Sequence, residues 1–127
     1  NSASSTIVFN KIKHSDELTG SNTAFRRLNR GVYYYQVTGD VNIVYQLNTA
    51  LYRLQLQSVL VEGGARLLQS FIDKGMWDEA RVITNEELIV ENGLNAPVLT
   101  GYQEVRSEKI FSDHIRYYQP LTQNHPI

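Results

Sequence analysis

Residues 59–65 read Val-Leu-Val-Glu-Gly-Gly-Ala, a short apolar run that ends in a carboxylate and two glycines. An apolar run bounded by turn residues is typical of a buried strand, here residues 59–61. Four apolar residues then follow at helical spacing, namely Leu67, Leu68, Phe71 and Ile72. Gly75 suits the left-handed residue at which such a helix ends. The segment therefore predicts a strand, a glycine turn and a helix, in that order.

Three further runs of β-branched and aromatic residues predict strands, at residues 6–9, 32–37 and 80–83. Residues 43–54 predict a helix that Asn42 would cap, because apolar residues recur there at spacings of four, four and three. This apolar stripe comprises Ile43, Leu47, Leu51 and Leu54, with Val44 on its flank. The order strand, helix, strand, helix, strand predicts a mostly parallel sheet with right-handed crossovers and helices on both faces.

The remaining segments carry weaker patterns. Residues 11–30 are polar, and Ala24, Phe25 and Leu28 would line one side of a short helix or turn. Residues 85–97 predict a long connection, with residues 88–90 as a candidate short strand. Three later segments read as strand pieces, at residues 98–102, 104–110 and 115–118. The predicted fold is α/β with three layers, a mostly parallel sheet flanked by helices with an antiparallel C-terminal edge.

Composition excludes several classes of protein. The 127 residues carry 12 Lys plus Arg and 13 Asp plus Glu, a net charge of −1, so nucleic acid and anionic membranes are not expected partners. No apolar run reaches the ~18 residues of a membrane span, and residues 1–5 lack the basic head and apolar core of a signal peptide. The absence of cysteine excludes a thiol nucleophile, a Cys-ligated zinc and an iron–sulfur cluster within these residues.

Other polar candidates suit structural roles better than chemistry. His14, His114 and His125 are too scattered for a local metal motif, so no metal site is predicted. Asp78 and Glu79 are adjacent residues at the start of a strand, so their side chains point to opposite faces. They predict a cap or a salt bridge rather than an acid/base pair.

The glycine turn has two interpretations. Glycines let a ligand approach the backbone closely, and the N–H groups and positive dipole end of the following helix attract phosphate. A carboxylate beside such a loop repels phosphate, so Glu62 is expected to accept hydrogen bonds from sugar hydroxyls or a ring N–H. In the other interpretation, Gly63 and Gly64 only make a tight turn from strand to helix. The segment does not match the G-x-G-x-x-G dinucleotide fingerprint.

Residues 59–82, which read VLVEGGARLLQSFIDKGMWDEARV, resemble the reductase domain of the bifunctional riboflavin-biosynthesis deaminase-reductase family. Members carry a strand, the motif V-E-G-G, a helix and then a G-x-x-D-E segment. The V-E-G-G motif corresponds here to residues 61–64, and the G-x-x-D-E segment corresponds to residues 75–79. The stripe in residues 43–54 and the segment Ala96-Pro97-Val98-Leu99 also fit. The resemblance implies a domain like dihydrofolate reductase, with a mainly parallel, helix-flanked sheet and an antiparallel C-terminal pair.

The activity implied by the resemblance is NADPH-dependent reduction of 5-amino-6-(5-phosphoribosylamino)uracil to the ribitylamino product. By matched position, Glu62 would contact the substrate. The residues that would line the NADPH phosphates are Gly63, Gly64, Ala65, Arg66 and Leu67. The Arg66 guanidinium has a competing and favoured assignment as a solvated group on an exposed helix face. NADPH rather than NADH comes from the resemblance alone.

Two features of the family are missing from these residues. The Asp-Gly segment that supplies the proposed acid is expected upstream of residue 1, and a zinc deaminase domain would also lie outside the chain. Residues 1–127 are therefore expected to be the C-terminal portion of a cytoplasmic reductase domain, with no turnover alone and no catalytic residue assigned. Exposed sheet edges make a homodimer the candidate assembly. The rival interpretation is a non-catalytic nucleotide-binding or dimerisation module of the same fold.

Overall fold

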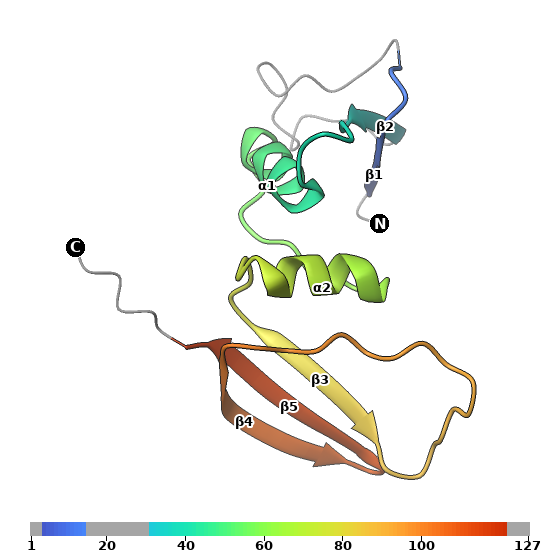
Figure 1. Ribbon diagram of the computed structural model, residues 1–127, viewed down its shortest axis with the longest axis vertical. Coiled ribbons are helices and arrows are strands. Elements are labelled where there is room, and N and C mark those ends of the chain that lie inside the picture. Colours follow the sequence, from blue (N-terminus) through green and yellow to red (C-terminus); the bar gives the residue numbers. More distant parts are fainter. Residues whose placement is uncertain (1–3, 15–30, 122–127) are drawn as a thin grey trace, which may run out of the picture. The chain divides into compact units, whose positions relative to one another are not determined.

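A computed structural model describes residues 4–14 and 31–121 of the chain (Figure 1). The chain divides into two compact units, Asn1–Leu60 and Val61–Ile127. The described elements are two helices and five strands, which confirms the predicted α/β class. The helix or turn expected within residues 11–30 falls mostly on residues outside the described ranges, and so does His125.

The first unit contains a pair of parallel strands, β1 (Ser5–Asn10) and β2 (Gly31–Gln36), which confirms both predicted strands. The pairing is regular, from Ser5 opposite Gly31 to Asn10 opposite Gln36. The aromatic rings of Phe9 and Tyr35 lie on neighbouring strands with their centroids 5.5 Å apart. Such cross-strand aromatic contacts stabilise the pairing of two strands.

Helix α1 (Ile43–Arg53) follows, and its predicted N-cap is confirmed because the Asn42 side chain accepts a hydrogen bond of 2.9 Å from Val44 N. The apolar stripe is rotated from the predicted position. Val44, expected on the flank, is fully buried together with Ala50 and Leu54. Ile43, Leu47 and Leu51 are only half-buried.

A side-chain amide of α1 fixes the turn that follows β2. Gln46 Oε1 accepts a hydrogen bond of 2.7 Å from Thr38 N, and Gln46 Nε2 donates to Thr38 O at 3.0 Å and Val41 O at 2.7 Å. In the same turn, a hydrogen bond from the Thr38 side chain lowers the pKa of Asp40 below its ordinary value. Gln46 therefore ties the backbone of the turn to the first helix.

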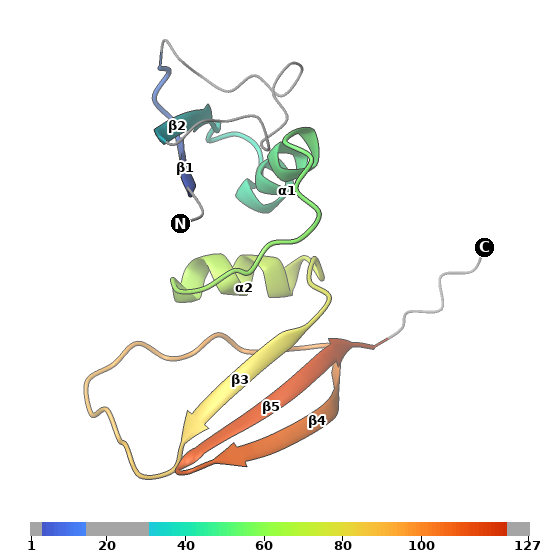
Figure 2. The same ribbon diagram turned by 180° about the vertical axis from the view of Figure 1, so that it is seen from behind.

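The second unit contains α2 (Ala65–Asp73) and three antiparallel strands, β3 (Ala80–Asn85), β4 (Tyr102–Ile110) and β5 (Asp113–Pro120). The strand order is β3-β5-β4, and both figures show β5 between its two neighbours (Figure 2). This sheet confirms the antiparallel C-terminal strands expected from the sequence. The ladder between β4 and β5 is interrupted by a bulge between Glu104 and Arg106, so Val105 has no partner in β5.

Some predicted strands are wrong. Residues 59–61 are not a strand, and Val59 and Leu60 are 55% and 78% exposed. Residues 88–90 and 98–101 belong instead to a connection without regular structure between β3 and β4. Three apolar residues in a row show a preference for burial, but they do not identify a partner strand.

The described strands lack the middle strand of the parallel order predicted from residue 32 to residue 83, and they form two sheets, in which β1 and β2 are parallel and β3 pairs antiparallel with β5. Among the residues that the structure describes, no helix has both the length and the apolar character of a membrane span. The same residues contain no group of three or more His, Asp or Glu side chains placed to hold a metal ion.

Candidate functional site

The two glycines before α2 both adopt left-handed backbone conformations. The φ angles are 71° at Gly63 and 70° at Gly64, a region that residues with a Cβ rarely adopt. A Cβ at Gly63 would meet no atom within 4 Å, and one at Gly64 would meet only Leu67 Cβ at 4.0 Å. The backbone conformation, rather than close packing, therefore requires glycine here, and the space beside both residues is open.

Helix α2 begins directly after this turn with Gly64 as its N-cap. No side chain caps the helix, and its first turn contains no acidic residue. The first hydrogen bond of the helix runs from Leu68 N to Gly64 O at 3.1 Å. N–H groups at the start of such a helix have no partner within the helix and lie at its positive end, where an anion is stabilised.

The predicted site residues occupy this turn and the first helical turn. Glu62 and Arg66 are exposed, whereas Ala65 and Leu67 are half-buried. The Arg66 carbonyl accepts a hydrogen bond of 2.9 Å from Ser70 Oγ, which accounts for that hydroxyl within the helix. The exposed position of Arg66 fits both assignments made from the sequence, which stay predictions.

Sequence reasoning missed a contact that holds α2, in which a side chain of the helix binds the backbone of a distant residue. Gln69 Oε1 accepts a hydrogen bond of 2.8 Å from Val98 N, and Gln69 Nε2 donates to Val98 O at 3.2 Å. Gln69 Nε2 also donates to Asp73 Oδ1 at 2.8 Å. No local pattern signals this contact, because its partner is a backbone peptide 29 residues further along the chain.

The other candidate residues take structural roles. His14 stacks on Tyr34 with ring centroids 3.8 Å apart, and it forms a hydrogen bond of 3.1 Å with the Asn10 side-chain nitrogen. Glu79 accepts a hydrogen bond of 2.7 Å from Arg81 Nε, which confirms the predicted salt bridge and raises the pKa of Arg81. These contacts leave the glycine turn as the candidate site.

The fold and this turn define an α/β protein in which a left-handed glycine pair leads into a helix N-terminus that no side chain caps. Residues 3–108 match the family model of the RibD C-terminal domain. The chain therefore belongs to the RibD C-terminal domain family, the reductase domain of riboflavin biosynthesis, as its resemblance to that family implied. No curated protein matches the chain.

Proposed function

We propose that this chain supplies the cofactor-phosphate loop of an NADPH-dependent reductase in riboflavin biosynthesis. The proposed reaction reduces 5-amino-6-(5-phosphoribosylamino)uracil to its ribitylamino product. One observation carries the proposal, which is the left-handed glycine pair before the N-terminus of α2, where no side chain caps the helix, in a member of this family. The dihydrofolate reductase-like arrangement of the sheet is part of the same proposal.

The residues of the turn suit different parts of the ligands. Gly63 and Gly64 leave room for a phosphate beside the backbone, and the N–H groups of Ala65 to Leu67 would donate hydrogen bonds to it. Glu62 would accept hydrogen bonds from substrate, because its negative charge disfavours a phosphate. Bound NADPH supplies the hydride, so the protein has to align the reactants and stabilise the opened sugar.

The experiment is a titration of the chain with NADPH, followed by nicotinamide fluorescence, for wild type and Gly64→Asp. The Asp variant places a negative charge at the helix terminus and should abolish most of the binding. Gly64→Asn is the control for shape, because Asn tolerates a left-handed conformation and carries no charge. Gly75→Asp is the control for backbone strain, because Gly75 has a φ of 61° and lies at the other end of the same helix.

The outcomes separate the two interpretations of the turn. Weak binding by Gly64→Asp, together with near-normal binding by Gly64→Asn and Gly75→Asp, supports the phosphate loop. Equal affinity of wild type and Gly64→Asp contradicts it and leaves Gly63 and Gly64 as a tight turn only. Binding without turnover in the intact protein would favour the non-catalytic nucleotide-binding module.

A homodimer is the assembly that we propose. Strand β3 is one of the two outer strands of the β3-β5-β4 sheet, its pairing with β5 is regular, and Ile83 is exposed. A regular edge strand with exposed apolar side chains is a template for a strand of another copy. Sedimentation of wild type and Ile83→Lys tests this assembly, and a wild-type protein that stays monomeric contradicts it.

A further inference from the structure

The side-chain amide of Gln69 hydrogen-bonds both backbone groups of one residue, Val98, in the connection between β3 and β4, as a neighbouring strand would. It accepts from the N–H of Val98 and donates to the carbonyl of the same residue. Asp73 fixes the orientation of the amide, because its carboxylate accepts from the Nε2 end. A flipped amide would oppose donor to donor at Val98 N and acceptor to acceptor at Asp73.

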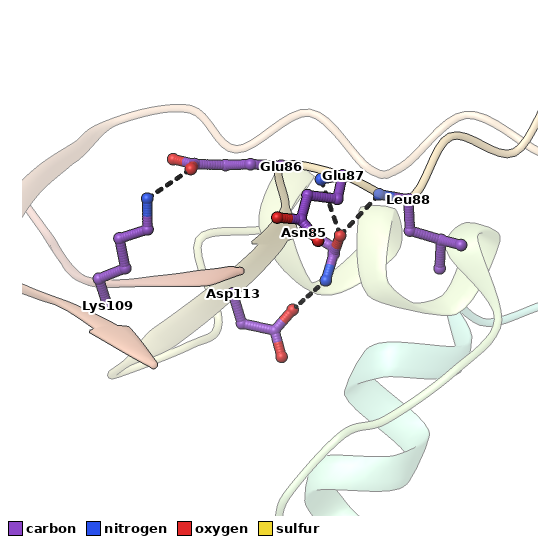
Figure 3. A network of polar contacts seen from close by, with 6 residues as sticks. All are labelled: Asn85, Glu86, Glu87, Leu88, Lys109 and Asp113. Carbon is purple, nitrogen blue, oxygen red and sulfur yellow. Dashed lines mark hydrogen bonds and ion pairs between the residues drawn. The ribbon is translucent and has the colours of Figure 1, made fainter. Parts of the chain in front are cut away.

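The connection itself is anchored to the sheet at its first residues. Asn85 Oδ1 accepts hydrogen bonds from Glu87 N at 2.9 Å and Leu88 N at 2.7 Å, and Asn85 Nδ2 donates to Asp113 Oδ1 at 2.8 Å (Figure 3). The Glu86 carboxylate pairs with Lys109 of β4. This network holds the beginning of the connection against the hairpin formed by β4 and β5.

The connection is also anchored at its last residue, where Gly101 O accepts a hydrogen bond of 2.9 Å from Leu121 N. Val98 lies three residues before this anchor. The hydrogen bond at Gly101 therefore restrains the backbone of Val98 relative to the sheet. Because Gln69 binds that backbone, helix α2 is restrained as well.

Gln69 lies in the middle of α2, which has nine residues and is capped by Gly64. A helix of this length moves as one piece, so a tether at Gln69 also sets the direction of the N–H groups at its start. The position of donors matters strongly in a binding site, because a misplacement of about 1 Å weakens the alignment of the reactants. The tether is thus connected to the proposed site through one rigid element.

We propose that Gln69 is a positioning residue for the cofactor-phosphate loop, which it aligns by tying α2 to the Val98 peptide. The inference rests on the proposed function, because it assigns to Gln69 an effect on cofactor affinity. It requires no contact between Gln69 and the cofactor.

The test compares three variants of the 127-residue chain by titration calorimetry with NADP⁺. Gln69→Leu keeps a side chain of similar size and removes all three hydrogen bonds of the amide, and the dissociation constant should rise about tenfold, or ~1.4 kcal/mol. Gln69→Glu keeps the acceptor for Val98 N but loses the donor at neutral pH, so its affinity should fall between wild type and Gln69→Leu. Gln46→Leu is the matched control, because it removes an equivalent amide tether in the first unit.

Two readouts separate positioning from a loss of stability. The introduced carboxyl of Gln69→Glu regains a donor when it is protonated, so its affinity relative to wild type should recover as the pH falls towards about 4–5. Amide hydrogen exchange at Val98 should be faster in Gln69→Leu and unchanged in Gln46→Leu.

Equal affinities of wild type and Gln69→Leu would overturn this inference and leave the phosphate loop intact. The same weakening in Gln46→Leu would also overturn it, because the effect would then follow from stability alone. A wild-type chain that does not bind NADP⁺ contradicts the proposed function and the inference together.

Discussion

The hydroxyl group of Tyr117 donates a hydrogen bond to Oε1 of Glu108 across the pair of strands β4 and β5. The Tyr117 ring also contacts two guanidinium groups, with Arg106 Cζ at 3.9 Å and Arg81 Cζ at 5.4 Å from its centroid. These residues come from all three strands of the sheet, and Tyr117 is paired with both arginines in the ladder. One tyrosine therefore connects β3, β5 and β4.

This contact predicts a loss of stability in alkaline solution. The hydrogen bond to Glu108 raises the pKa of Tyr117 above its ordinary value of 10.0. A raised pKa in the folded state stabilises the fold fully below about pH 10, and this contribution disappears as the pH rises through the folded value. Thermal unfolding between pH 8 and about pH 11.5, followed by circular dichroism, should show a smaller alkaline decrease for Tyr117→Phe than for wild type. Identical pH profiles would contradict this role of the hydroxyl.

The anchor of the long connection predicts the opposite dependence, in acid. The ion pair with Lys109 lowers the pKa of Glu86 below its ordinary value of 4.5. A lowered pKa contributes stability that is present above about pH 4.5 and is lost as the pH falls through the folded value. Carboxyl resonances followed by NMR should show the titration of Glu86 move upward in Lys109→Met. An unmoved titration in that variant would show that Lys109 does not set the pKa.

The small apolar core of the first unit depends on a few side chains. Leu54 is 1% exposed, and Leu54→Ala should lower the free energy of unfolding by about 2–5 kcal/mol because it leaves a cavity. Tyr52, in the last turn of α1, is 84% exposed, and Tyr52→Ala should change that free energy by less than about 0.5 kcal/mol. Urea denaturation measures both values, and similar values for the two variants would contradict the assigned core.

The N-cap of α1 gives a fourth stability prediction. Asn42→Ala removes the acceptor of the hydrogen bond from Val44 N and should lower the free energy of unfolding by about 1 kcal/mol. Asn42→Asp keeps an acceptor at the same position and should retain most of the stability. A loss in the Asp variant as large as in the Ala variant would show that the cap is not the cause.

The solvated assignment of Arg66 predicts a small effect on cofactor binding. If backbone N–H groups hold the phosphates, Arg66→Ala should raise the NADPH dissociation constant by less than about threefold. A hydrogen bond to a charged group is worth about 1.5–3 kcal/mol, so a direct guanidinium contact would produce a loss of tenfold or more. Fluorescence titration in a buffer of fixed ionic strength decides between the two assignments.

Local sequence patterns were sufficient for most helices and strands. Asn42 and the apolar spacing after it predicted α1, and Gly75, whose φ is 61°, marked the end of α2. Periodicity placed the centre of the buried face poorly, since Val44 is buried more deeply than Ile43. That face is set by the tertiary neighbours of α1, which a helical pattern does not contain.

The pairing of strands and the tether of the site were not predictable in the same way. Residues 59–61 have the composition of a strand, but a ladder also needs a partner at the right distance. Within the candidate site, Gly63 and Gly64 were recognisable because left-handed backbone favours glycine. Gln69 was not, because an amide on a polar helix face usually contacts water.

Val105 is the one residue of β4 between Glu104 and Arg106 that has no partner in β5. It is the extra residue of the bulge in β4, with Glu104 opposite Tyr118 on one side and Arg106 opposite Tyr117 on the other. Deletion of Val105 would thus leave every other pair in register and produce an uninterrupted outer strand. The shortened chain should keep its fold, because the remaining β4–β5 pairs are unchanged. It should also be less soluble, because a bulge discourages an edge strand from pairing with a strand of another molecule.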